Sequence, residues 1–237
     1  MDEKILKPEL VRSLLAIKGE ARGMHFKSDG DYVLKLKGKE GLEKLEKELM
    51  AVGCPIDFNK IKNLAFYPAG WRAISLLAIK QTFDWGDEDI RRVCNFAVSA
   101  SLIVRLYMRF FYSIPKLIEQ VPKMWKEYFS EGELKVIEFN EDERRVVVRI
   151  ENFSLHSVYC RCFEGYLEHF IKMVVGAKTV KCQEIKCVFN GDKFHEFLVK
   201  WQLSPTVSEL SSDLEAKEYS GRENFIQILC RFVARVP

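Results

Sequence analysis

The chain has 237 residues, of which 48% are hydrophobic and 30% are charged, and its formal net charge is +3. A chain of this length and composition buries a substantial core without metal or disulfide staples, which excludes disorder and fibrous repeats for most of it. The 37 basic and 34 acidic side chains nearly cancel, so no overall field attracts nucleic acid or an anionic membrane. We therefore expect no nucleic-acid partner.

The N-terminal part of the sequence predicts a mixture of helices and short strands. A helix is expected at residues 8–18, followed by short strands at 23–28 and 31–38 that are joined by a turn. Residues 41–50 place leucines on one face and Glu and Lys on the other, which indicates an amphipathic surface helix.

The middle of the chain predicts helices. One is expected at residues 71–83 and a longer one at 87–112, with acidic residues in its first turn. Another helical segment begins at Pro115, and we expect Pro122 to kink or split it. The longest uncharged stretch, at 93–104, is too short to cross a bilayer, so no membrane span is expected.

The last third changes to a strand pattern around one helix. Its predicted elements are a hairpin of 133–139 with 144–150, an amphipathic helix at 158–175 closed by Gly176, and a second hairpin of 178–188 with 194–203. A strand pair, a helix and a second strand pair indicate an α+β fold, in which an antiparallel sheet packs against a helical layer. We expect a single ligand-binding α+β domain at 1–203, mainly helical at 20–132 and sheet-forming at 133–203, with a connector and a helix at 204–237.

The seven cysteines suggest a chemical role for only part of the set. The N-terminus lacks the apolar core of a signal peptide, which favours a cytoplasmic location, and cysteines there are expected as free thiols or metal ligands. Cys54, Cys94 and Cys230 stand alone in apolar surroundings and are expected to be buried packing residues. Cys162 and Cys182 are left undecided.

The second hairpin brings two candidate metal ligands together. A three-residue loop at 190–192 pairs Cys187 with His195, and directly opposed residues have Cβ atoms about 4.5–5.5 Å apart. A two-residue loop would shift this pairing by one residue and separate the two side chains.

Two further ligands complete a candidate zinc site, which consists of Cys160, Glu184, Cys187 and His195. Zn²⁺ takes four N, S or O ligands in a tetrahedron. Because Glu184 and Cys187 face opposite sides of a regular strand, the site requires a bulge between them. The alternative is that His195 is a satisfied histidine at the margin of the core and that the cysteines only pack.

Catalytic motifs are missing from the sequence. It contains no GxSxG, P-loop, HExxH or GxGxxG pattern, so we name no catalytic residue and expect no nucleotide cofactor. His25 and His156 have no identifiable partners, and His169 is expected at a helix surface or edge. Because no histidine lies on the middle helices to act as a proximal ligand, we expect no haem.

Aromatic side chains are concentrated in the helical middle, among them Phe96, Trp125, Tyr128 and Phe129. They either pack the core or line a cavity between helices and sheet for an apolar ligand. The sequence does not separate these two interpretations.

Residues 159–201 resemble the C-terminal signature of 4-vinyl reductase-type domains, the predicted hydrocarbon-binding family. The matching features are Cys160 before Gly165-Tyr166, the Glu-x-x-Cys motif at Glu184 to Cys187, the turn at Gly191-Asp192, and His195 where the family often has Cys. The longer span 21–201 is similar to a related family of uncharacterised paralogues that is abundant in myxobacteria.

The resemblance implies a fold shared with the ligand-binding domains of nitric-oxide signalling and Golgi-transport proteins. It implies a non-enzymatic sensor of an apolar or aromatic small molecule, a homodimer, and zinc at Cys160, Glu184, Cys187 and His195, as in some aromatic-sensing members. One alternative is a protein interaction or dimerisation module whose pocket is filled by side chains. The other is an enzyme that acts on an apolar small molecule.

Overall fold

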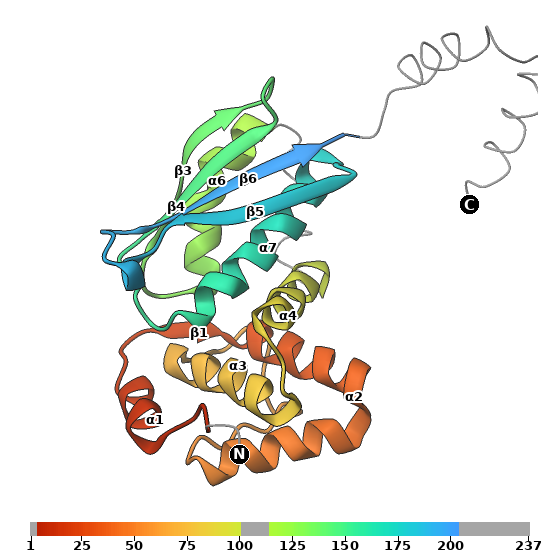
Figure 1. The fold of residues 1–237 in the computed structure, drawn as a ribbon, viewed down its shortest axis with the longest axis vertical. Coiled ribbons are helices and arrows are strands. Elements are labelled where there is room, and N and C mark those ends of the chain that lie inside the picture. Colours follow the sequence, from red (N-terminus) through yellow and green to blue (C-terminus); the bar gives the residue numbers. More distant parts are fainter. Residues whose placement is uncertain (1–3, 101–113, 204–237) are drawn as a thin grey trace, which may run out of the picture. The chain divides into compact units, whose positions relative to one another are not determined.

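The computed structural model describes residues 4–100 and 114–203, and its compact unit ends at Gln202. In chain order the elements are α1 (Pro8–Leu15), β1 (Glu20–Arg22), α2 (Gly23–Ala51), β2 (Phe66–Pro68), α3 (Ala69–Phe83), α4 (Asp87–Ala100), α6 (Ile114–Tyr128), β3 (Glu133–Asn140), β4 (Arg145–Glu151), α7 (Val158–Val175), β5 (Thr179–Lys186), the 3₁₀ turn η1 (Val188–Asn190) and β6 (His195–Gln202) (Figure 1). None of the helices within those ranges has the length and apolar character that crossing a membrane requires. The predicted connector and helix at 204–237 lie outside the described residues.

Helix α2 replaces two predicted strands. Residues 23–28 and 31–38 are helical, and the predicted turn between them does not exist. His25, Phe26, Asp29 and Val33 are all buried, and this spacing puts them on one face of a helix. Two short stretches of alternating polar and apolar residues suggested strands, but the packing of one helix face against the core favours a helix instead. Only Gly38, with a φ of 68°, leaves the helical conformation, and glycine adopts it at little steric cost.

The positions of the other predicted helices hold within the described residues, whereas the predicted split at Pro122 is wrong. Helices α1, α3 and α7 occur where they are predicted, and Gly176 ends α7 with a φ of 61°. Helix α4 covers the first part of the predicted 87–112 helix, and the rest lies outside the described residues. Helix α6 is not split at Pro122, whose ring lies on the exposed side of the helix. The small antiparallel pair of β1 and β2 was not predicted.

The four-stranded sheet confirms the predicted fold class. Its order is β3-β4-β6-β5 with all neighbours antiparallel, so each predicted hairpin forms and the two meet at β4 and β6. One face is apolar and is covered by α6 and α7 (Figure 1). Its buried residues on the two central strands are Val146, Val148, Ile150, Phe197, Val199 and Trp201. The result is an antiparallel sheet packed against a helical layer.

Helix α7 also packs closely against α4. A Cβ atom at Gly165 would overlap the carbonyl oxygen of Arg91, so only glycine allows this approach. Cys94 and Cys162 form a disulfide across the same contact. The predictions that the cysteines are free thiols or metal ligands, and that Cys94 is an isolated packing residue, are therefore wrong for this pair. The two residues are 68 positions apart, a separation at which sequence spacing reveals no contact.

Candidate metal centre and apolar cavity

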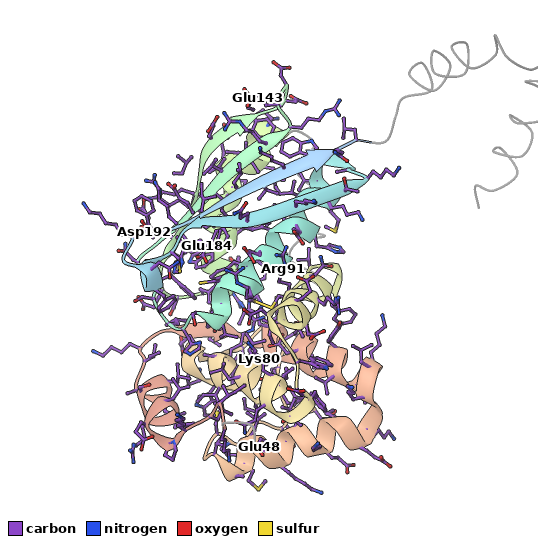
Figure 2. All side chains as sticks on the ribbon, viewed as in Figure 1. Glu48, Lys80, Arg91, Glu143, Glu184 and Asp192 are labelled. Atoms are coloured by element: carbon purple, nitrogen blue, oxygen red, sulfur yellow. A yellow bond between two sulfur atoms is a disulfide. The ribbon has the colours of Figure 1, made fainter. Side chains whose placement is uncertain are left out.

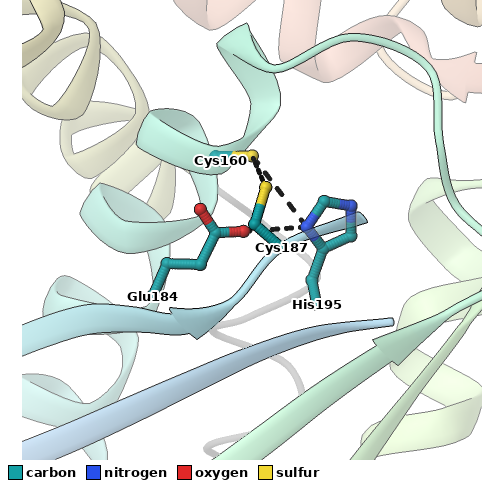
Figure 3. Close-up of side chains that lie close together, drawn as sticks. All are labelled: Cys160, Glu184, Cys187 and His195. Carbon is teal, nitrogen blue, oxygen red and sulfur yellow. Dashed lines mark hydrogen bonds and ion pairs between the residues drawn. The ribbon is translucent and has the colours of Figure 1, made fainter. Parts of the chain in front are cut away.

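The structure brings the four predicted metal ligands together between α7 and the second hairpin (Figure 3). One ligand atom from each of Cys160, Glu184, Cys187 and His195 lies within 4.8 Å of the others. The Sγ atom of Cys160 is 3.7 Å from Sγ of Cys187 and 3.9 Å from Nδ1 of His195. His195 Nδ1 is 2.8 Å from Oε1 of Glu184. The four atoms converge on one point, as the ligands of a single ion do.

A bulge in β5 produces this convergence. The pairing of β5 with β6 runs regularly from Thr179 to Glu184 and then shifts, so that Ile185 is the extra residue. The bulge that the site requires is thus confirmed. The prediction of a three-residue loop is wrong, because β5 ends at Lys186 and the η1 turn lies between β5 and β6. The bulge, rather than the turn type, brings Glu184 and Cys187 to the same side.

Hydrogen bonds fix which nitrogen of His195 faces the cluster. Its Nε2 lies 3.0 Å from the carbonyl oxygen of Phe153. A carbonyl only accepts, so Nε2 carries the proton and Nδ1 presents its lone pair to Cys160 and Glu184. The 2.8 Å contact between Nδ1 and a carboxylate oxygen joins two acceptors, and it requires a proton or a cation between them. The ring is 2% exposed, as the core-margin interpretation also expects.

Outer hydrogen bonds hold the ligands in place. Backbone N–H groups of Glu184 and Cys187 donate to the carboxylates of Glu164 and Asp192, each at 2.9 Å. Arg161 Nη2 lies 3.4 Å from Glu184 Oε2. Arg91 on α4, labelled in Figure 2 together with Glu184 and Asp192, donates to Glu164 at 3.3 Å. This bond connects the residues around the cluster to α4.

The thiol of Cys160 is disfavoured as an anion when no cation is near. Burial raises the pKa of Cys160, and the charge of Glu184 and the neighbouring Cys187 raise it further. A divalent cation would supply the opposite charge that these groups lack, since metal-bound cysteines are thiolates.

A second candidate site is an apolar cavity between the sheet, α6, α7 and the helices α2 to α4. Its volume is about 80 Å³. The aromatic residues that line it include Trp125, Tyr128, Phe129 and Phe163. Both interpretations of the aromatic cluster thus apply to Trp125, Tyr128 and Phe129, which pack the core and line the cavity.

One end of the cavity wall is polar. His25 is 5% exposed, and its Nε2 has no hydrogen-bond partner among the described residues. Burial, together with the charges of Arg72 and Arg22, holds the pKa of His25 well below its usual range, so the imidazole is neutral. Arg72, also in the wall, donates to Asp29 from Nε at 3.1 Å and from Nη2 at 3.3 Å. Burial raises the pKa of Asp29, although Arg72 opposes this.

The sequence did not single out this polar end. His25 and Asp29 are four residues apart, which places them on one helix face, but the segment was predicted as strands and a turn. The other two histidines within the described residues lie elsewhere. His156 Nδ1 accepts a hydrogen bond from the backbone N–H of Val158, and His169 Nδ1 lies 2.9 Å from Asn95 Oδ1.

Comparison with known proteins identifies the fold. No family model and no curated protein matches the chain. Among solved structures, an H-NOX protein from S. oneidensis in the Fe(II)NO ligation state has a TM-score of 0.57 at 14% identity, covering 76% of this chain and 99% of that one. A mutant H-NOX domain from Shewanella oneidensis in the Fe(II)CO state gives 0.57 at 15% identity, with coverages of 77% and 99%. Fe(II) unliganded H-NOX from K. algicida gives 0.56 at 12% identity, with coverages of 78% and 98%. At these identities the likeness shows the fold alone.

The comparison corrects one expectation. We expected no haem because no histidine lies on the middle helices. The solved structures that match are H-NOX domains, which bind haem, and this finding overturns the expectation. The expectation considered only the middle helices, whereas His25, which lines the cavity, lies on α2.

Proposed function

We propose that this chain is a non-enzymatic small-molecule-binding domain of sensory type, whose ligand occupies the apolar cavity. The observation that carries the proposal is the contrast within the cavity wall, which is mostly apolar, with polar groups at the end formed by His25 and Arg72 and on Tyr128 and Tyr166. Ligand pockets typically combine an apolar lining with a few polar groups that fix orientation.

The unpaired nitrogen of His25 supports a bound ligand. A buried polar atom without a hydrogen bond destabilises a protein by about 1–3 kcal/mol, and a ligand atom at Nε2 would remove this penalty. The two polar groups at this end do not form an acid–base pair, because His25 is held neutral and the guanidinium of Arg72 is held by Asp29. Binding is therefore a better account of the cavity than catalysis.

Haem is the ligand that the fold implies, and the cavity residues fit it in one respect. A neutral, buried imidazole whose Nε2 has no partner among the described residues is suitable as an iron ligand, and His25 provides one. When bound, haem iron would supply a coordination position for a diatomic gas. The apolar wall would exclude water from the ring. Because the cavity is about 80 Å³, the helices lining it would have to move apart to admit a macrocycle.

The test uses three measurements on the full chain. Native mass spectrometry of protein purified without additives reports any retained molecule and the oligomeric state, for which we propose a homodimer. Titration with hemin is followed by visible absorption, and titration with toluene by the fluorescence of Trp125 and the other tryptophans. We expect His25→Ala to weaken hemin binding at least about tenfold and His169→Ala to leave it unchanged, because only His25 lines the cavity.

The outcomes separate the ligand classes. Hemin binding that depends on His25 identifies a haem protein, and toluene binding alone identifies an apolar ligand, as the resemblance to 4-vinyl reductase-type domains implies. The proposal is contradicted if the purified protein retains no molecule and neither hemin nor toluene binds in the titrations. That outcome would favour the second candidate, an interaction module with a filled core, for which the small cavity volume is the supporting observation.

We further propose that Cys160, Glu184, Cys187 and His195 hold Zn²⁺. In a tetrahedral site with Zn–S bonds of about 2.3 Å, two sulfurs lie roughly 3.8 Å apart. The Sγ atoms of Cys160 and Cys187 are 3.7 Å apart. The ion would replace the proton between His195 and Glu184 and would brace the second hairpin against α7. This donor set also agrees with the proposed relation to 4-vinyl reductase-type domains.

A further inference from the structure

The disulfide between Cys94 and Cys162 lies in the wall of the apolar cavity. Both residues line the cavity, and both are buried from the outer surface, with exposures of 1% and 3%. A molecule that reaches either sulfur must therefore be small and apolar enough to enter the cavity. This setting differs from that of Cys160 and Cys187, which belong to the metal cluster.

Arg72 distinguishes the two sulfurs. Its Nη2 lies 3.6 Å from Sγ of Cys94, and two hydrogen bonds to Asp29 hold the guanidinium in this position. A positive charge beside a thiol stabilises the thiolate, which is the nucleophilic form of cysteine. No charged side chain of the described residues makes a comparable contact with Cys162. This contact favours Cys94 over Cys162 as the nucleophile of the reduced pair, with Cys162 as the second thiol that completes a disulfide.

We propose that Cys94 and Cys162 form a reversible thiol pair that is oxidised by organic hydroperoxides entering the cavity. The Cys94 thiolate attacks the terminal oxygen of the hydroperoxide, so that an S–O bond forms and the O–O bond breaks. The alkoxide takes the proton that the Cys94 thiol gave up and leaves as an alcohol. Cys162 sulfur then attacks Cys94 sulfur, and the S–O bond breaks. The hydroxide leaves with the Cys162 proton as water. Overall, one hydroperoxide and two thiols give one alcohol, one water and one disulfide.

The disulfide between Cys94 and Cys162 links the oxidation to the arrangement of two helices. The disulfide joins α4 to α7, and α7 carries Cys160 of the metal cluster. Oxidation therefore fixes the two helices that form one side of the cavity. In proteins of reducing compartments, a disulfide is typically catalytic or redox-sensing, which agrees with the expected cytoplasmic location.

The experiment maps disulfides in the reduced full chain after treatment with tert-butyl hydroperoxide or hydrogen peroxide. Trypsin cleaves after Arg161 and so separates Cys162 from Cys160, which makes the mass assignment unambiguous. We expect the Cys94–Cys162 bond to form with tert-butyl hydroperoxide at least about tenfold faster than with hydrogen peroxide, because the cavity favours apolar molecules. In Cys162→Ser, dimedone should label Cys94.

Two variants complete the test. Removing Arg72 alone would leave Asp29 as a lone buried charge, so the double variant Arg72→Gln with Asp29→Asn is used, and it should slow oxidation about tenfold. Cys54→Ser, which removes a buried cysteine elsewhere, should not alter the rate. A disulfide that resists dithiothreitol in the folded protein, dimedone label on Cys162 rather than Cys94, or equal rates with both peroxides would each overturn the proposal.

Discussion

The metal cluster and the cavity lie on different sides of the same turn of α7, and they are built in opposite ways. The cluster gathers one ligand atom from each of four side chains within 4.8 Å of one another. The cavity is surrounded by apolar side chains from helices and strands along most of the described chain, with one polar end at His25 and Arg72. The first arrangement suits an ion of fixed geometry. The second suits a molecule that is held by shape and by one or two polar contacts.

The largest effect is expected from a substitution that removes a metal ligand and leaves the cavity intact. Cys187→Ser should abolish zinc binding and lower the free energy of unfolding by about 3 kcal/mol, because folding and metal binding are coupled. Elemental analysis and urea unfolding measure the two effects. Cys182→Ser is the matched control, since Cys182 is a buried free cysteine of β5 outside the cluster. Wild-type protein without zinc, or a Cys187→Ser variant that retains it, would contradict the assignment.

An intermediate effect should appear on the cavity side of α7. Alanine is favoured over glycine in a helix by about 1 kcal/mol, so Gly165→Ala would stabilise an exposed helix. Here the added Cβ overlaps the carbonyl oxygen of Arg91, and we expect a net destabilisation of about 2 kcal/mol. Zinc content should not change, because the overlap involves the backbone of Arg91, and neither Gly165 nor Arg91 is a ligand of the cluster. A stabilised variant in urea unfolding would show that α4 and α7 are not in close contact.

The smallest expected effect concerns the pH dependence of the cavity. The pKa of His25 is lowered in the folded chain, so below a pH of about 6.5 the unfolded chain binds a proton there that the folded chain does not. The free energy of unfolding should therefore fall as the pH drops from about 6.5 toward the folded-state pKa, by at most about 1.4 kcal/mol per pH unit for this group.

His25→Phe should make this decline shallower, as measured by urea unfolding between neutral and mildly acidic pH. His156 and His169, whose pKa values burial also lowers, contribute in the same direction and remain in the variant. An unchanged slope in His25→Phe would mean that His25 is not held neutral in the cavity wall.

The contrast between the two sites also explains what the sequence could predict. The cluster depends on one hairpin and on the first turn of the preceding helix. The spacing of Glu184, Cys187 and His195 along the chain was therefore enough to predict that these side chains meet. Even the bulge at Ile185 was required by the alternation of side chains along β5. The α+β class followed in the same way from the order of strand pairs and helix.

The cavity depends on contacts between distant segments. His25 approaches the sheet only because residues 23–51 form a helix, and their short alternating pattern predicted strands instead. The pairing of Cys94 with Cys162 likewise needs α4 and α7 side by side. Sequence periodicity describes which face of an element is apolar, and it does not say which elements meet.

The spacing between Cys160 and Cys162 has a consequence for how such chains can diverge. Each residue advances about 100° around an α-helix, so two positions turn the side chain by about 200°. One cysteine therefore reaches the hairpin while the other reaches α4. Inserting or deleting a single residue between them would rotate one thiol away from its partners whatever the rest of the sequence did. Descendants that keep both features must therefore keep this interval.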